Sequence, residues 1–280
     1  METGIFYFSA TGNSLAAAKA IAAHFDCPNV INIAEAVCGD RIFAGYDRVI
    51  AVYPSYAYGT PVAVRRFFQR AEIKKGGYVA ALVTYGSKQG GALAEAKRLL
   101  RRRGIKLNYA GRIPAVENFI PMFGAPKKKK LIARTAMQEQ AVKTICAEIE
   151  SGKKRGVCAF RVLPKIVSAV FRAARPLIVK FYRVEKSCTG CGICERVCPV
   201  RAVKIINGKP KFSGKCEICQ CCVNWCPQKS VSFLRVKPET PRYTNANVTL
   251  SEFIMKGNQA DAEQEEFAQE EFAGEAAAIT

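Results

Sequence analysis

The sequence predicts an α/β fold, in which a doubly wound, five-stranded parallel sheet is followed by a small α+β unit rich in cysteine. Strand-like and helix-like segments alternate over residues 1–152, as they do when helices join parallel strands. The second, third and fourth strand segments contain continuous apolar runs rather than an alternating pattern, which is typical of strands buried on both faces. Nine of the thirteen cysteines lie between Cys188 and Cys226. We therefore expect domains at 1–152 and 184–237, a linker at 153–183 and a tail at 238–280.

Each element of the first domain is predicted from its pattern of apolar residues. The strands are expected at 4–8, 30–33, 47–53, 77–85 and 104–113, and the helices near 14–25, 61–71, 90–103 and 128–150. Right-handed crossovers put the loops after the strands at one edge of the sheet, where ligands bind. No run approaches the ~20 apolar residues of a membrane helix, and the N-terminus lacks the basic region of a signal peptide. We expect a cytoplasmic protein.

The linker at 153–183 contains nine basic residues and no acidic one. On a helical wheel, Arg161, Lys165, Arg172 and Arg175 share one face. The opposite face is apolar and consists of Phe160, Leu163, Val167, Val170, Phe171, Ala174 and Ile178. Pro164 and Pro176 predict short helices with a kink or break. The apolar face is expected to pack between the domains; the alternative is peripheral contact with an anionic membrane.

Two runs of cysteines share the spacing C-x2-C-x2-C-x3-C-P, in "CTGCGICERVCP" and "CEICQCCVNWCP". This is the bacterial ferredoxin spacing for two [4Fe–4S] clusters, in which the fourth cysteine of each run binds the other cluster. One cluster is therefore assigned to Cys188, Cys191, Cys194 and Cys226, and the second to Cys216, Cys219, Cys222 and Cys198. Zinc is the alternative metal, because paired CxxC spacings also form zinc ribbons. The surplus Cys221 is interpreted as a buried thiol rather than as an alternative ligand. The segment "KIINGKPKF" between the runs predicts a hairpin that turns at Asn207-Gly208.

The charge is distributed unevenly along the chain. The formal net charge is +20, made up of +27 in residues 1–237 and −7 in the tail. The basic runs at 101–103 and 127–130 are expected on solvated helix ends; the alternative is that they dock an acidic redox partner. No nucleic-acid partner is expected, because no RNA-binding motif or interleaved aromatic platform accompanies the basic runs. The acidic tail, with its near-repeat "EEFAQEEFAG", is expected to be disordered or weakly helical.

The loop after the first strand reads Ser9-Ala10-Thr11-Gly12-Asn13-Ser14. A loop of small residues between a strand and a helix presents free N–H groups at the helix N-terminus, where phosphate binds. The loop has no lysine, so it does not have the sequence of a nucleotide-hydrolysing P-loop. A terminal monophosphate held by hydroxyls and amides is the expected ligand.

This loop resembles the first loop of the flavodoxins, which binds the phosphate of FMN. The resemblance implies side-chain contacts from Ser9, Thr11, Asn13 and Ser14, and mainly backbone amides from Ala10 and Gly12. It also implies that the loops at 53–61 and 84–91 bind the flavin, with the candidate residues Pro54, Ser55, Tyr56, Tyr58, Thr84, Tyr85 and Gly86. Tyr56, Tyr58 or Tyr85 would pack on the isoalloxazine ring. The alternative is an ordinary strand-to-helix turn in a domain that binds no flavin.

The complete arrangement is similar to the flavodoxin–ferredoxin fusion proteins of anaerobic bacteria and archaea. The segments "YFSATGNS", "PSYAYGTP", "ENFIPMF" and "KFYRVEKSCTGCGICERVCP" carry the resemblance, which covers residues 1–237. It implies an electron-transfer protein that relays electrons between FMN and two [4Fe–4S] clusters and exchanges them with a redox partner protein. No Ser-His-Asp set is found, and no catalytic residue or substrate is assigned. The alternatives are a dicluster ferredoxin whose first domain is a flavin-free docking module, and a nucleic-acid-binding protein with structural metal.

Overall fold

The computed structural model describes residues 1–39, 42–157 and 162–254 of the protein. Its central sheet is entirely parallel, with the strand order β2-β1-β4-β6-β7. The five strands are β1 (Thr3–Tyr7), β2 (Val30–Asn32), β4 (Arg48–Pro54), β6 (Tyr78–Tyr85) and β7 (Tyr109–Pro114). Numbered within the sheet, this order is 2-1-3-4-5, the flavodoxin-like arrangement. The predicted fold class is confirmed.

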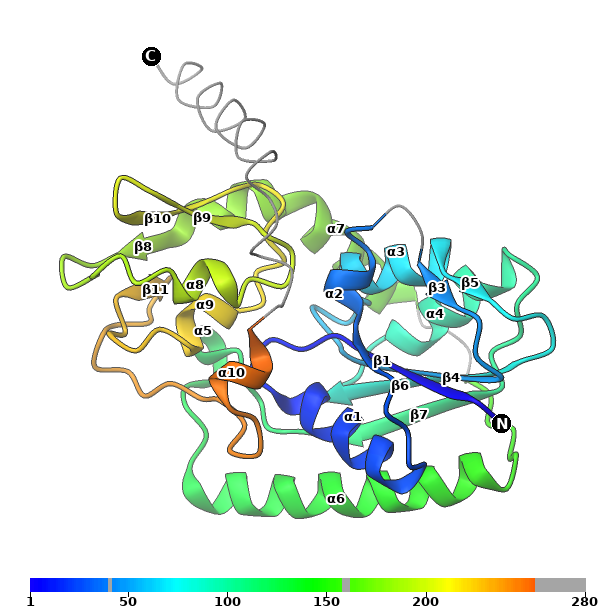
Figure 1. The fold of residues 1–280 in the computed structure, drawn as a ribbon. Coiled ribbons are helices and arrows are strands. Elements are labelled where there is room, and N and C mark those ends of the chain that lie inside the picture. The colour runs from blue at the N-terminus through cyan, green and yellow to red at the C-terminus, as the bar shows by residue number, and fades with distance from the viewer. Residues whose placement is uncertain (40–41, 158–161, 255–280) are drawn as a thin grey trace.

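Helices cover both faces of the sheet (Figure 1). One face carries α1 (Asn13–His24) and α6 (Lys128–Glu150), and the other carries α3 (Val62–Arg70) and α4 (Ala92–Arg101). Neighbouring residues of β1 enter different cores: Ile5 packs in the α1/α6 core and Phe6 packs in the α3/α4 core. Strands with two buried faces need continuous apolar sequence, which explains the runs that predicted them.

Some elements differ from the sequence prediction. The short helices α2 (Ile33–Ala36) and α5 (Ile120–Phe123) and the parallel pair β3 (Phe43–Ala44) and β5 (Glu72–Ile73) were not predicted. Strand β7 begins later than the predicted residue 104, because Gly104 turns the chain with φ 71° after α4. The main-chain N–H of Asn108 donates to Val79 O, and its side-chain Oδ1 accepts from Val79 N. These two bonds set the register of the strand.

The cysteine-rich unit lies beyond the carboxyl ends of the sheet strands (Figure 1). Its elements are β8 (Tyr182–Val184), α8 (Ile193–Arg196), β9 (Val203–Ile206), β10 (Lys209–Phe212), α9 (Cys221–Asn224) and β11 (Val231–Phe233). Strand β8 pairs with β11 and β9 pairs with β10, both antiparallel. The predicted hairpin turn is confirmed, since Asn207 and Gly208 have φ 50° and 71° between β9 and β10.

The linker forms one long helix, α7 (Val162–Ile178), followed by the 3-10 turn η1 (Val179–Phe181). The prediction of short helices with a break is wrong in the described residues. Pro164 lies in the first helical turn, where a missing N–H costs nothing, and Pro176 lies in the last turn. Phe160 and Arg161 lie outside the described residues. Within the described ranges, no helix combines the length and the apolar character needed to cross a bilayer.

The faces of α7 are used differently from the expectation. Its basic side faces the protein, where Arg172 approaches Glu95 at 3.6 Å and Arg175 approaches Glu217 at 3.6 Å. Part of its apolar side is exposed, including Leu163 and Val170. The basic face packs between the domains because two buried carboxylates there need cationic partners.

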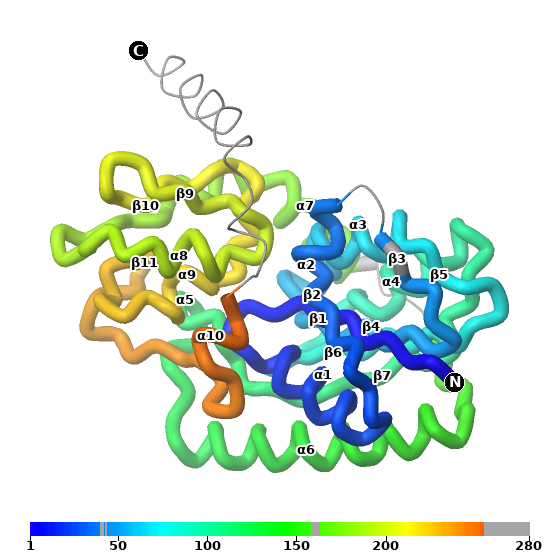
Figure 2. The backbone as a smooth tube through the Cα atoms, viewed as in Figure 1, coloured from blue at the N-terminus to red at the C-terminus, as the bar shows by residue number. Residues whose placement is uncertain are grey.

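The tail prediction is wrong for residues 238–254. This segment folds back along α1 and ends in α10 (Leu250–Phe253), drawn in orange in Figure 2. Thr249 caps α10 in a complete capping box with Glu252. Tyr243, Val248 and Phe253 are buried, so the segment has enough apolar contacts to remain ordered. Residues 255–280 lie outside the described residues.

Candidate functional site

The four cysteines assigned to the first cluster line one cavity. Cys188, Cys191 and Cys194 come from the first run, and Cys226 comes from the end of the second. Left-handed turns at Gly190 (φ 72°) and Gly192 (φ 73°) wrap the first run around the cavity. Gly190 also packs against the main chain of Gly208. A Cβ added at Gly190 would lie 2.8 Å from the Gly208 carbonyl oxygen, so a larger residue would not fit. Cys191 is exposed, which puts one edge of this cavity at the surface.

The cysteines assigned to the second cluster also lie together. The pKa of the Cys216 thiol is raised, first by burial and then by the neighbouring Cys219 and Cys198. Burial, followed by Cys216, Cys219 and Cys198, raises the pKa of Cys222. Cys198, Cys216 and Cys222 are all buried. Cys226 of the second run thus lies with the first group, and Cys198 of the first run lies near Cys216 and Cys222.

The two cysteine groups are related by a repeat of the backbone. Left-handed φ values recur at Gly190 and Ile218, at Gly192 and Gln220, and at Arg201 and Lys229. Each pair is separated by 28 positions, as are the starts of α8 and α9. Ile218 and Gln220 adopt a conformation that glycine occupies in the first run, and tight packing holds them there, since both are almost fully buried.

The chemistry of these groups fits an iron–sulfur cluster. Each group presents four thiols, and Pro227, which follows Cys226, lines the first cavity. Backbone amides point at the sulfurs: Ala202 N donates to Cys198 Sγ at 3.2 Å, and Ile218 N donates to Cys216 Sγ at 3.3 Å. Such amide hydrogen bonds stabilise thiolates and tune cluster potential. Among the residues that the structure describes, no three His, Cys, Asp or Glu side chains could hold a single metal ion.

Cys221 lies next to Cys219 of the second group, and its thiol also bonds to the main chain. Its thiol is 1% exposed and donates a hydrogen bond to Val197 O at 3.0 Å. Burial raises its pKa well above that of a free thiol, which favours the neutral form. This contact is consistent with the interpretation of Cys221 as a buried thiol.

The loops assigned to FMN meet at a second cavity, at the carboxyl ends of β1, β4 and β6. Most of the predicted residues line it: Ser9, Ala10, Thr11, Asn13, Ser14, Pro54, Ser55, Tyr56, Thr84, Tyr85 and Gly86. Gly12 and Tyr58 do not. Gly12 lies under Asn245 and Val248, and Tyr58 lines a different cavity between α4 and α7. The sheet thus brings eleven of the thirteen residues to one site.

The loop after β7 completes this cavity and was not assigned from the sequence. It contributes Ala115, Val116, Glu117 and Asn118. The sequence contained a signal for it, because the loop follows the fifth predicted strand and therefore opens at the same edge of the sheet. Glu117 lies directly over Gly86, where an added Cβ would overlap its carboxylate. Its carboxylate puts a negative charge beside the cavity.

The first loop fits a phosphate through its backbone more than through Asn13. The first helical bond of α1 runs from Ala16 N to Gly12 O, so the amides before it have no acceptor within the helix. The Asn13 side chain is occupied: it donates to Val116 O and accepts from Tyr243 Oη at 2.7 Å and from Asn245 Nδ2 at 3.1 Å. Asn13 therefore holds the loop in place.

Two aromatic side chains, Trp225 and Tyr56, connect the loops assigned to FMN (after β1, β4 and β6, called the flavin-type loops) to the cysteine-rich unit. The Trp225 indole N–H donates to the Ala10 carbonyl at 2.9 Å. Tyr56 lies in the cavity and also packs in the same core as Cys219. Burial raises the pKa of Tyr56 well above its ordinary value, and Cys219, Glu217 and Cys221 raise it further. Tyr56 therefore belongs both to the cavity lining and to the core that Cys219 packs against.

Residues 238–254 cover the first loop from outside. Asn245 N donates to Thr11 O at 2.7 Å, and Phe253 stacks on Trp225 with ring centroids 4.8 Å apart. Lys19 of α1 forms an ion pair with Glu252. The sequence contained a local signal for this contact, the capping box at Thr249 to Glu252, but nothing in it indicates which surface α10 covers.

Comparisons with known proteins match two separate parts of the chain. Residues 181–204 match the family described as a 4Fe-4S binding domain. No curated protein matches the chain. A Fusobacterium nucleatum flavodoxin bound to flavin mononucleotide is 15% identical, with a TM-score of 0.38, over 55% of this chain and 100% of its own. A two-electron reduced Megasphaera elsdenii flavodoxin is 19% identical, with a TM-score of 0.31, over 50% of this chain and 98% of its own.

The family match and the observed sheet together describe the chain. A segment that matches the 4Fe-4S binding family follows a sheet with flavodoxin-like strand order. Iron–sulfur clusters of this type exchange single electrons, so the chain has a function in electron transfer.

Proposed function

We propose that this protein relays electrons between FMN and two [4Fe–4S] clusters and exchanges them with a partner protein. FMN would bind at the loops after β1, β4 and β6. The contact between these loops and the second cysteine group carries the proposal, since Tyr56 lines the loop cavity and packs in the core that holds Cys219. A relay requires neighbouring cofactors, and this contact supports that arrangement.

The 28-residue repeat supports two clusters rather than one. The family match covers only the first run of cysteines, at 181–204. The second run repeats its left-handed turns and its short helix, and the strands that follow the two helices, β9 and β11, also begin 28 positions apart. A backbone built twice around two sets of four thiols supports two equivalent binding sites.

The exposure of the cysteines supports an order for the relay. Cys191 is exposed, whereas Cys198, Cys216 and Cys222 are buried. The first cluster would therefore exchange electrons with a partner at the surface, and the second would exchange them with the flavin. Bound FMN supplies a two-electron centre that also exchanges single electrons with the clusters. Tyr56 and Trp225 fill the junction and exclude water from it.

Cofactor analysis of protein purified without oxygen tests the proposal. We expect about eight irons, eight sulfides and one FMN per chain, and a reductive titration that takes up about four electrons. Eight irons without flavin, even after FMN is added, would favour the alternative in which the first domain is a docking module. Zinc in place of iron and sulfide would overturn the electron-transfer proposal.

The surface near the exposed cysteine supports an acidic redox partner. Lys186 and Arg196 are exposed near Cys191 in the chain, and Lys209 Nζ donates to Cys188 O at 2.8 Å. The positive charges at this edge would attract a negatively charged partner and speed its association. We expect the reduced protein to be oxidised faster by the anion ferricyanide than its Lys186→Gln/Arg196→Gln variant is. The Lys128→Gln/Lys129→Gln variant, with the same charge change on α6, is the control; equal loss in both variants would contradict local docking.

A further candidate function is attachment to an anionic membrane, which the exposed side of α7 supports. Leu163 is 69% exposed, Val170 is 62% exposed and Leu177 is 67% exposed, and Ile166 lies on the same face. Lys180 and Arg183 are exposed just beyond the helix. An apolar helix face with neighbouring cations suits the interface of an anionic bilayer, and such exposed faces are uncommon in proteins that remain free in solution.

Whether or not it attaches to a membrane, we propose that the protein resides in the cytoplasm. This compartment is reducing, so the cysteines remain thiols that can bind metal.

Vesicle sedimentation tests this attachment. We expect binding to vesicles rich in phosphatidylserine but not to phosphatidylcholine vesicles, and its loss in Leu163→Ser/Val170→Ser. These two side chains are exposed, so the fold should not change. The Met122→Ser variant, which alters another exposed apolar side chain, is the control. Equal binding by wild type and by the α7 variant would rule out the helix as the anchor.

A further inference from the structure

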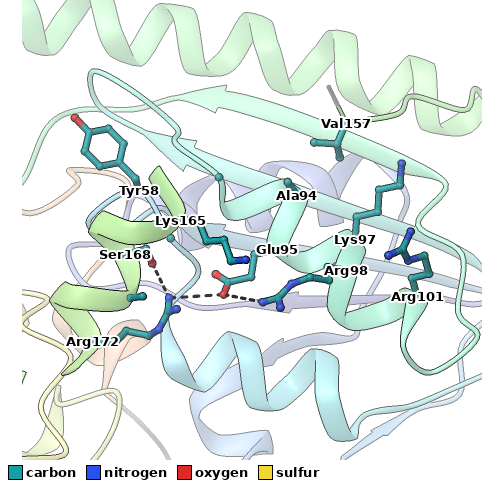
Figure 3. A pocket seen from close by; sticks show the side chains of 13 residues that line it. Tyr58, Ala94, Glu95, Lys97, Arg98, Arg101, Val157, Lys165, Ser168 and Arg172 are labelled. Carbon is teal, nitrogen blue, oxygen red and sulfur yellow. Dashed lines mark hydrogen bonds and ion pairs between the residues drawn. The ribbon is translucent and has the colours of Figure 1, made fainter. Parts of the chain in front are cut away.

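A large cavity between α4 and α7 lies outside the sites described above. Its volume is about 490 Å³, within the range of small-molecule sites. Figure 3 shows its lining, in which Arg98 and Arg172 are directed at Glu95. The cationic residues of the lining are Lys97, Arg98 and Arg101 from α4, and Lys165 and Arg172 from α7.

One carboxylate, that of Glu95, lies at the inner wall of this cavity. Glu95 is 7% exposed and accepts a hydrogen bond from Thr60 N at 3.0 Å. Its carboxylate also pairs with Arg65 of α3, with Arg98 at 3.7 Å and with Arg172 at 3.6 Å. One negative charge thus faces three guanidinium groups and leaves positive charge in excess.

The like charges affect one another. Burial, followed by the nearby cations Arg172 and Arg98, lowers the pKa of Arg65 to about 10. The pKa of Arg98 is also lowered, by burial and then by Arg102 and Arg172. All these groups remain charged at neutral pH, so an anion entering the cavity would relieve their repulsion.

The outer rim adds three cations that Glu95 does not neutralise. Lys97, Arg101 and Lys165 are exposed, and none of them forms an ion pair within residues 1–39, 42–157 and 162–254. They stand around the same cavity as Arg98 and Arg172. Several cations on two helices can contact several oxygens of one multiply charged group.

We propose that this cavity binds a small polyphosphate anion, such as the diphosphate or triphosphate of a nucleotide. Guanidinium groups bind phosphate oxygens in pairs, and lysines add point charge, which matches the mixture at this site. The volume of the cavity is that of a small-molecule site, whereas an acidic peptide would need an extended groove. The site lies against the Tyr58–Gly59 turn of the second flavin-type loop. The inference goes beyond the proposed electron relay and does not depend on flavin.

Isothermal titration of the cluster-loaded full chain with pyrophosphate, at low salt and without oxygen, tests the proposal. We expect saturable binding to one site. The Lys97→Gln/Arg101→Gln/Lys165→Gln variant should bind about tenfold or more weakly. The Lys128→Gln/Lys129→Gln/Lys130→Gln variant carries the same charge change on α6 and should lose less than about twofold, because distant charges are screened. All six side chains are exposed, so both variants should fold.

Titration with ADP identifies which part of a nucleotide the site binds. Equal affinity for ADP and pyrophosphate assigns binding to the phosphates, and tighter ADP binding assigns a nucleotide; both results support the site. Absence of saturable binding, or equal loss in the two triple variants, would overturn it. Binding of poly-glutamate but not of pyrophosphate would also overturn it, in favour of an acidic peptide. Flavin content is not part of this readout, so failure here leaves the electron relay untouched.

Discussion

The indole nitrogen of Trp225 donates a hydrogen bond to the main-chain carbonyl of Ala10 at 2.9 Å, across 215 positions of sequence. Trp225 precedes Cys226, which belongs to the first cysteine group, and Ala10 lies in the first loop of the sheet. The only tryptophan of the chain thus ties the metal-binding unit to the loop assigned to phosphate. The indole ring also stacks on Phe253, which fixes residues 238–254 to the same junction.

Replacement of Trp225 by phenylalanine should weaken this junction. The variant retains an aromatic ring against Phe253 but leaves the buried Ala10 carbonyl without its donor. We expect a loss of about 1 kcal/mol in unfolding free energy, seen as a lower urea midpoint without oxygen. Trp225→Ala should lose more, because it also removes the stacking. An unchanged midpoint in the phenylalanine variant would mean that the hydrogen bond contributes nothing to stability.

Replacement of Cys221 and of Cys222 should have opposite effects on iron content. Cys221 donates to Val197 O, a role that a serine hydroxyl can take over, so Cys221→Ser should retain about eight irons per chain. Cys222 is surrounded by Cys216, Cys219 and Cys198, and Cys222→Ser should lower the iron content to about four. Iron and sulfide assays on both proteins provide the measurement. A loss of iron in Cys221→Ser would identify Cys221 as a ligand.

Replacement of Glu117 should strengthen flavin binding. Its carboxylate lies beside the cavity and would repel the phosphate of FMN. We expect Glu117→Gln to bind FMN roughly fivefold more tightly, equivalent to about 1 kcal/mol. The measurement is quenching of FMN fluorescence by the cluster-loaded protein. Glu139→Gln, an exposed change of equal charge on α6, is the control. Weaker binding in Glu117→Gln would show instead that Glu117 supports the flavin site.

The anchor of α10 should depend on pH through Glu252. The hydrogen bond from Lys19, followed by those from Thr249, lowers the pKa of Glu252 to about 2. Because the folded-state pKa is lowered, the ionised Glu252 carboxylate stabilises the folded segment, and this stabilisation is fully present above the ordinary pKa of about 4.5. It is lost as the pH falls through about 2.

Pepsin digestion measures this effect in its own acidic range. We expect Glu252→Gln to be cut faster than wild type at Leu250 and Phe253 at pH 4.5, and the difference to shrink as the pH approaches 2. Lys19→Gln should behave in the same way, because it removes the other partner. A difference that stays constant with pH would mean that the charge of Glu252 does not hold the helix.

Much of the candidate site could be predicted because its signals are local. The loops at 9–14, 54–58 and 84–86 follow strands whose apolar runs are legible in the sequence, and a parallel sheet brings the ends of its strands to one edge. The loop of Glu117 follows the fifth strand and opens at the same edge, so the same reasoning could have found it; the flavodoxin resemblance was applied only to the loops after the first, third and fourth strands. The role of Asn13 could not be predicted, since its partners Tyr243 and Asn245 come from more than 200 positions away.

The sequence by itself determined the strands, their parallel order and the grouping of cysteines, because periodicity and spacing are properties of the chain. Only the tertiary structure decided which face of α7 points inward and where residues 238–254 lie. On a helical wheel, either face of α7 could be buried. The buried carboxylates Glu95 and Glu217 select the basic face, because a buried charge is stable only beside an opposite one, and both come from distant segments.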